Sequence, residues 1–170
     1  MECLRSRSKK IKGMRLQAKS HLTHLELIWT TGAESKASER DGSILQDIAL
    51  HKSIKSLLVR GFSGSAISSK VTLFSYLDEL CLRSCERLEH LPASVLNVKS
   101  LRLDSLDCLM EIVNDNDDNG NSPSLREISL RKVPKFTGFR GFGQNTGAIK
   151  QFESLDCLYI EECPKLFSIP

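Results

Sequence analysis

The sequence lacks the long apolar stretches that membrane-spanning and secreted proteins carry. No segment of the 170 residues approaches the roughly 18 consecutive apolar residues of a transmembrane helix. The chain opens on basic residues, without the apolar segment of a signal peptide, and it has no Asn-x-Ser/Thr glycosylation motif. Its six cysteines are therefore expected to be reduced thiols and not a disulfide framework. These absences predict an intracellular, cytoplasmic protein with no membrane partner.

Residues arranged for catalysis are also scarce. No serine lies in a nucleophile elbow, and the histidines are scattered over the chain, at His21, His24, His51 and His90. The stretch from Gly138 to Asn145 has the glycine spacing of a phosphate-binding loop, but Gln144 stands where that loop needs its lysine. We expect no enzymatic activity, no catalytic residue and no cofactor.

Two patterns resemble metal sites, but one lacks a required ligand and the other has its ligands too far apart. One has the spacing of a calcium loop over Asp115, Asp117, Asn119 and Gly120, but Arg126 occupies the position of its closing glutamate. The other consists of the cysteine pairs Cys81/Cys85 and Cys157/Cys163. These pairs lie three repeat units apart, on the order of 14 Å, whereas zinc binds sulfur at about 2.3 Å. We expect no metal site, and Cys85 and Cys163 should be small buried apolar residues.

Charge is unevenly distributed along the chain. The formal net charge is +3, yet the first 20 residues alone hold seven Lys and Arg side chains against one Glu. We interpret residues 1–20 as a basic leader, and a nuclear-import role for it stays open. No aromatic residue is interleaved with these charges to stack on bases, so no nucleic-acid partner is expected.

What the sequence does contain is a repeat of apolar, two variable residues, apolar, one variable residue, apolar. The six copies are Leu22/Leu25/Leu27, Ile54/Leu57/Val59, Leu77/Leu80/Leu82, Val98/Leu101/Leu103, Leu125/Ile128/Leu130 and Leu155/Leu158/Ile160. This is the strand signature of a leucine-rich repeat, whose copies bury a continuous core only when stacked. The pattern predicts an α/β fold: a leucine-rich-repeat solenoid (horseshoe) with one short parallel strand per repeat and irregular or helical returns. The repeat domain should span residues 21–170, with loop insertions at 30–43, 113–124 and 137–149.

The variable strand positions are the candidate binding residues, because side chains alternate along a strand and these should project from the concave face. Arginine favours interfaces, since its planar fork pairs with carboxylates. The candidate protein-binding residues are Arg60, Arg83, Arg102, Arg131 and Tyr159. The alternative is a solvated charged face, partly neutralised by Glu79, Asp104 and Glu127. The four arginines could form a basic track across four adjacent strands.

Four segments resemble the leucine-rich-repeat region of plant nucleotide-binding disease-resistance proteins of the coiled-coil branch. They are residues 14–29, 51–64, 85–92 and 163–170, the last two matching Cys-x-x-Leu-x-x-Leu-Pro turns. The resemblance implies a protein ligand, a pathogen effector or a host protein, recognised in plant defence. It also implies a nucleotide-binding domain as a possible partner, in cis or in trans. Because the chain has no such domain itself, it is expected to be a fragment or a truncated relative.

Two other functions stay open at this point. One is a leucine-rich-repeat adaptor that selects substrates for ubiquitin ligation, although residues 1–20 are too short and too charged for an F-box-like helical segment. The other is a truncated gene product without any function of its own. The sequence does not name the ligand or the oligomeric state.

Overall fold

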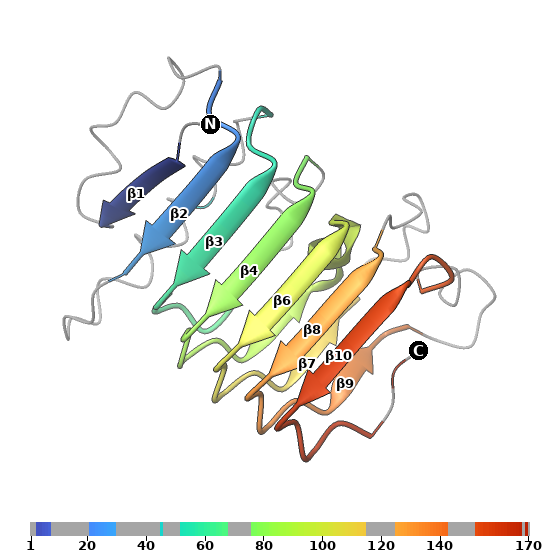
Figure 1. Cartoon of the computed structure of the whole chain (residues 1–170). Coiled ribbons are helices and arrows are strands. Elements are labelled where there is room, and N and C mark those ends of the chain that lie inside the picture. The colour runs from blue at the N-terminus through green and yellow to red at the C-terminus, as the bar shows by residue number, and fades with distance from the viewer. Residues whose placement is uncertain are drawn as a thin grey trace.

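Seven parallel strands form the main sheet of the computed structural model (Figure 1). Residues 3–7 (backbone only), 21–29, 45, 52–67, 76–114, 125–142, 152–167 and 169 are described. The strands follow one another in chain order as β1 (Cys3–Arg7), β2 (His24–Ile28), β3 (Ser56–Arg60), β4 (Glu79–Arg83), β6 (Ser100–Asp104), β8 (Glu127–Arg131) and β10 (Cys157–Glu161). One parallel strand per repeat, with few helices, is the arrangement of a leucine-rich-repeat solenoid.

The apolar repeat explains why these segments pair in one register. In β3, the second and third apolar residues, Leu57 and Val59, are 1% exposed, while the residues between and around them face outward. Leu57 lies beside Leu25 on one side and Leu80 on the other. A slip by one residue would turn the apolar set toward water, so burial fixes the register. All six strands predicted from the repeat are confirmed.

The seventh strand, β1, was not expected. It pairs with β2 so that Leu4 lies in register with Leu25 and Ser6 with Leu27. Ser6 stands where the repeat has its third apolar residue, which hid this copy in the sequence. The stretch interpreted as a basic leader thus contributes a strand, while the division at residue 20 stays a prediction.

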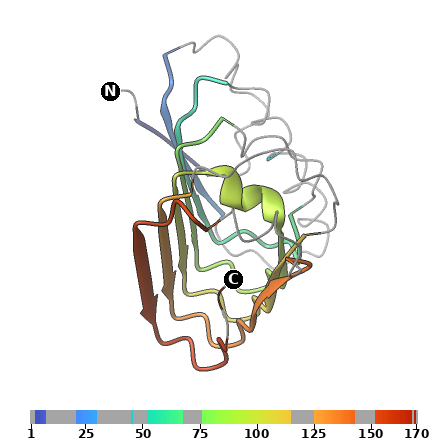
Figure 2. The ribbon, with the colours of Figure 1, turned by 90° about the vertical axis from the view of Figure 1, so that its right-hand side faces the viewer.

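A second, small parallel sheet lies on the far side of the core from the main sheet (Figure 2). It consists of β5 (His90–Pro92), β7 (Glu111–Val113) and β9 (Gly138–Arg140), and the short 3₁₀ helix η4 (Ala93–Asn97) follows β5. The core between the layers is apolar, with Leu88, Leu109, Val133 and Phe136 fully buried. Within the described residues, no helix is long and apolar enough to cross a membrane.

The insertion expected at 137–149 is corrected in its first part, because residues 138–140 form β9. Phe139 makes edge-to-face contacts with Phe136, Phe142 and Phe152, at ring-centroid distances of 5.6, 5.9 and 5.2 Å. Gly141 has a φ of +81°, and the carbonyl of Asn114 occupies the space that a Cβ would need. These glycines and phenylalanines therefore form the packed segment that returns from one strand of the main sheet to the next. Interpreting the glycine-rich composition as a loop does not reveal this packing.

The other insertions are placed only in part. Val113 belongs to β7 and Asn114 follows it, so the insertion expected at 113–124 can begin no earlier than residue 115. Residues 115–124, including the calcium-like loop, lie outside the described residues, as do 30–43 and 143–149.

Five strands of the main sheet end in the same unusual backbone conformation. The residue after the strand has positive φ at Gly61 (70°), Ser84 (51°), Ser105 (57°), Lys132 (52°) and Glu162 (55°). At the first four of these residues the N–H donates to the carbonyl that ends the next strand of the main sheet, as in Ser84 N to Asp104 O at 3.0 Å. This ladder holds a conformation that L-residues otherwise avoid.

Candidate protein-binding face

The outward side of the main sheet, called here the strand face, carries three rows of side chains. They come from the first, third and fifth residues of each strand from β2 to β10, which the register aligns across the sheet. The central row is Glu26, Leu58, Cys81, Arg102, Ser129 and Tyr159. The last row is Ile28, Arg60, Arg83, Asp104, Arg131 and Glu161. Rows lie about 7 Å apart along a strand, and strands about 4.8 Å apart.

The structure places all five candidate binding residues on the strand face. Arg102 and Tyr159 lie in the central row, whereas Arg60, Arg83 and Arg131 lie in the last row. The arginines occupy four adjacent strands, as expected, but Asp104 stands between Arg83 and Arg131 in their row. A straight basic track is therefore interrupted at β6, and the binding role of these residues stays a prediction.

Most of these arginines meet a carboxylate on the next strand. Arg83 Nε lies 3.1 Å from Asp104, Arg102 Nη2 lies 3.3 Å from Glu127, and Arg131 Nε lies 3.0 Å from Glu161. The alternative interpretation named Asp104 and Glu127 as neutralising groups, and Glu161 joins them. The Arg102–Glu127 and Arg131–Glu161 pairs are the more exposed ones, and such pairs contribute about 0–1 kcal/mol each to stability.

Tyr159 is tied to the same carboxylate as Arg131. Its hydroxyl donates to Glu161 Oε2 at 2.9 Å. This hydrogen bond, together with the negative charge of Glu161, raises the pKa of Tyr159. Tyr159 is 51% exposed, so its ring is presented to solvent at the C-terminal edge of the strand face.

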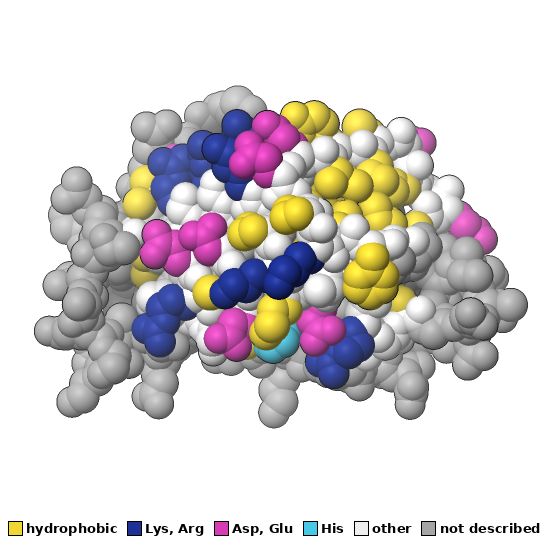
Figure 3. Space-filling view, turned by 90° about the horizontal axis from the view of Figure 1, so that it is seen from below, with side chains coloured by type: hydrophobic (Ala, Val, Ile, Leu, Met, Phe, Trp, Pro, Cys, Tyr) yellow, Lys and Arg dark blue, Asp and Glu magenta, His cyan; other side chains and the backbone are white. Residues whose placement is uncertain are grey.

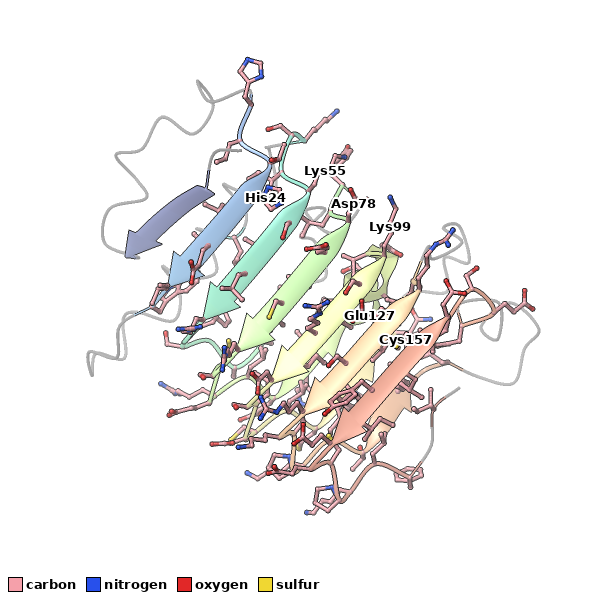
Figure 4. All side chains as sticks on the ribbon, in the orientation of Figure 1. His24, Lys55, Asp78, Lys99, Glu127 and Cys157 are labelled. Atoms are coloured by element: carbon pink, nitrogen blue, oxygen red, sulfur yellow. The ribbon has the colours of Figure 1, made fainter. Side chains whose placement is uncertain are left out.

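The strand starts carry a second set of polar contacts that the sequence did not indicate. Ser56 donates to Glu79 and Ser100 donates to Glu127, each at 3.1 Å. One residue earlier, Lys99 Nζ lies 2.8 Å from Asp78, and Lys55, Asp78 and Lys99 mark neighbouring strand starts (Figure 4). The register of the strands brings these polar groups together. Aligning the charged residues of successive repeats in this register would have revealed the contacts from the sequence.

The cysteines differ in their surroundings. Burial raises the pKa of the Cys85 thiol to about 11, and its S–H donates to the carbonyl of Arg83 at 3.4 Å. Cys163 makes the equivalent bond to the carbonyl of Glu161, also at 3.4 Å. Cys85 is fully buried, which confirms its interpretation as a small core residue. The same expectation is wrong for Cys163, which is only partly buried because it follows β10 at the end of the described sheet. In the part of the chain that the structure describes, no group of three or more His, Cys, Asp or Glu could hold a metal ion.

The C-terminal end of the sheet leaves apolar side chains exposed. Leu158 and Ile160 are each 44% exposed, and Phe167 is 81% exposed. Seen from below, the largest group of hydrophobic side chains lies toward the right-hand side, the side of β10 in Figure 1 (Figure 3). The remaining part of this underside mixes charges of both signs, so the end near β10 differs from the rest of the underside.

One family of proteins matches the chain. The family described as R13L1/DRL21 LRRs matches residues 1–112, about two thirds of the sequence and including β1. No curated protein and no solved structure matches the chain. The match covers five strands of the main sheet, β1 to β4 and β6, and agrees with the repeat pattern. The chain therefore belongs to the R13L1/DRL21 family, the leucine-rich repeats of plant resistance proteins of the nucleotide-binding type.

Proposed function

We propose that this chain is the protein-binding module of a plant disease-resistance protein, an innate immune receptor of the cytoplasm. Its ligand is a pathogen effector or a host protein, bound in the defence response on the strand face. The main sheet curves as a horseshoe with the strand face on its concave side. A nucleotide-binding domain, in the same or another chain, is the second partner. The module acts by binding and needs no catalytic residue or cofactor.

One observation carries this proposal: inward and outward strand positions vary to very different degrees. The second apolar position of the repeat holds Leu in five of six copies and Ile128 in the other, whereas the central outward row holds six different residue types. The inward positions are constrained by the stacked core. The outward positions do not pack into that core, so their side chains can be specified by a partner. An extended row of varied side chains suits protein recognition better than binding of a small molecule.

The test is a complementation experiment with matched charge reversals. The gene for this chain is first disrupted in the plant that carries it. It is then restored as the wild type, as the Arg102→Glu variant or as the Arg87→Glu variant. Arg102 lies on the strand face, while Arg87 is an exposed residue of the turn after β4. Disruption is expected to abolish defence against at least one pathogen of a panel. The wild type and Arg87→Glu should restore it, and Arg102→Glu should not. Unchanged defence after disruption, or restoration by both variants, would refute the proposal.

A further inference from the structure

Arg60 differs from the other three arginines of the strand face. Arg83, Arg102 and Arg131 each have a carboxylate within 3.3 Å. Across the described ranges, Arg60 forms no ion pair, and its Nε is buried without a hydrogen-bond acceptor. A buried donor of a charged group without an acceptor is unfavourable. Among the described residues, this one cation of the strand face therefore has no counter-charge.

The position of Arg60 makes its guanidinium ready for a carboxylate. Its side chain is half-buried, so part of its hydration is already lost in the free protein. A carboxylate that reaches the guanidinium gains a charge-assisted bond while the arginine loses little further hydration. Arg83, which lies beside Arg60 on the neighbouring strand, already forms an ion pair with Asp104.

The surface next to Arg60 is apolar. Ile28 lies beside Arg60 in the last row, and Leu58 and Cys81 are neighbours in the central row. All three side chains are partly exposed on the strand face. Arg102 lies beside Cys81 in the central row, and Arg60 and Arg83 lie beside each other in the last row, so the arginines border this apolar surface. An apolar group resting on Leu58 and Cys81 would lie close to Arg60.

The acidic residues of these strands leave this corner open to a carboxylate. Glu79 accepts a hydrogen bond from Ser56 at the opposite end of the strands, four residues from Arg83 and about 13 Å away. Glu26 on β2 has an interaction of its own. From β6 to β10, the fifth-position charges Asp104, Arg131 and Glu161 are all used in ion pairs. The charge distribution thus favours an anion at the ends of β2 and β3.

We propose that a peptide segment with an Asp or Glu next to a large apolar residue docks on the strand face over β2, β3 and β4. Its carboxylate binds Arg60, and its apolar side chain rests on Ile28, Leu58 and Cys81. The inference rests on the proposed function, because it names the chemistry of the partner for the same face. It assigns the acidic contact of the partner to the N-terminal half of that face.

A selection with random twelve-residue peptides displayed on phage tests this docking with the full chain as bait. Enriched peptides should share an acidic residue beside Leu, Ile, Phe or Trp. Their affinity should fall about tenfold or more on Arg60→Gln, as expected for loss of a charge-assisted bond, and also when the acidic residue becomes its amide. Arg131→Gln is the matched control, since Arg131 has the same strand position but is paired, and it should change the affinity less than about twofold.

Several outcomes would overturn the proposal. These are enrichment of peptides without an acidic residue, no enrichment over a mock selection, or an unchanged affinity for Arg60→Gln. Circular dichroism shows whether the variant is folded, and Arg60→Lys should restore part of the affinity by returning the charge without the planar fork. If peptides bind through Arg102 and Tyr159 with Arg60 irrelevant, the acidic docking fails while the proposed function stands.

Discussion

Leu158 on β10 lies in register beside Ile128 on β8, yet 44% of its surface is exposed, against 1% for Ile128. The two residues occupy the same position of successive repeats. In the described sheet, Ile128 has a strand on both sides, whereas Leu158 has a strand on one side. Burial in this fold therefore comes from the neighbouring unit and not from the repeat itself.

The first prediction concerns this dependence on neighbours. Leu101→Ala should lower the free energy of unfolding by about 2–5 kcal/mol, because Leu101 is fully buried between two strands. Leu158→Ala removes the same atoms from a half-exposed position and should cost about 1 kcal/mol or less. Urea unfolding followed by circular dichroism measures both values. Equal losses would mean that β10 is covered in solution.

The left-handed turn residues give a second prediction. Lys132 has a φ of 52°, so Lys132→Gly should stabilise the protein by about 1 kcal/mol. Gly61→Ala should destabilise it by more, because a Cβ there would meet the carbonyl of Trp29 as well as the positive φ. Thermal unfolding measures both changes, and Lys135→Gly in the following turn serves as the control. No stabilisation by Lys132→Gly relative to this control would contradict the turn geometry.

A third prediction follows from the buried thiol of Cys85. Its pKa is raised from 9.0 to about 11, so the folded state retains a proton that the unfolded state has lost. The stabilising contribution is complete below pH 9 and declines as the pH rises toward 11. Between these values, wild type should lose about 2 kcal/mol more stability than Cys85→Ala. Denaturation curves at pH 8 and pH 10.5 measure the difference, and parallel losses in the two proteins would argue against a buried thiol.

The ion pairs of the strand face give a fourth prediction. The side chain of Arg102 is largely exposed and that of Glu127 partly exposed, with relative side-chain areas of 59% and 35%. Arg102→Gln should therefore change the free energy of unfolding by less than about 1 kcal/mol. Chemical denaturation at low and high salt measures this. A larger loss would mean that Arg102 is kept for stability, and the strand face would then lose its clearest candidate for binding.

Much of the strand arrangement could be predicted from the sequence, because the apolar repeat reports burial directly. Leu80 and Leu82 are apolar since a neighbouring unit covers them, and the same spacing places Cys81 and Arg83 outside. The five candidate binding residues were placed on the correct face for this reason. The burial pattern does not show what these five residues bind.

What the sequence concealed depends on contacts between units. β1 was missed because Ser6 breaks the apolar pattern in a strand held by backbone pairing. β9 was missed because Gly138 and Gly141 are typical of loops, although Gly141 is required by its close approach to Asn114. The pairing of Arg83 with Asp104, and the absence of such a partner for Arg60 among the described residues, depend on which strands are adjacent.

The most direct test of the central claim asks which face of the sheet touches a protein in the plant cell. A photo-crosslinking amino acid is placed at Ser129 or Tyr159 on the strand face, and at Arg87 or Lys135 in the turns as controls. After irradiation of challenged leaf tissue, the account predicts one shared protein adduct at both strand positions and none at the turns. Adducts that form equally at the turns, or at the turns alone, would contradict it.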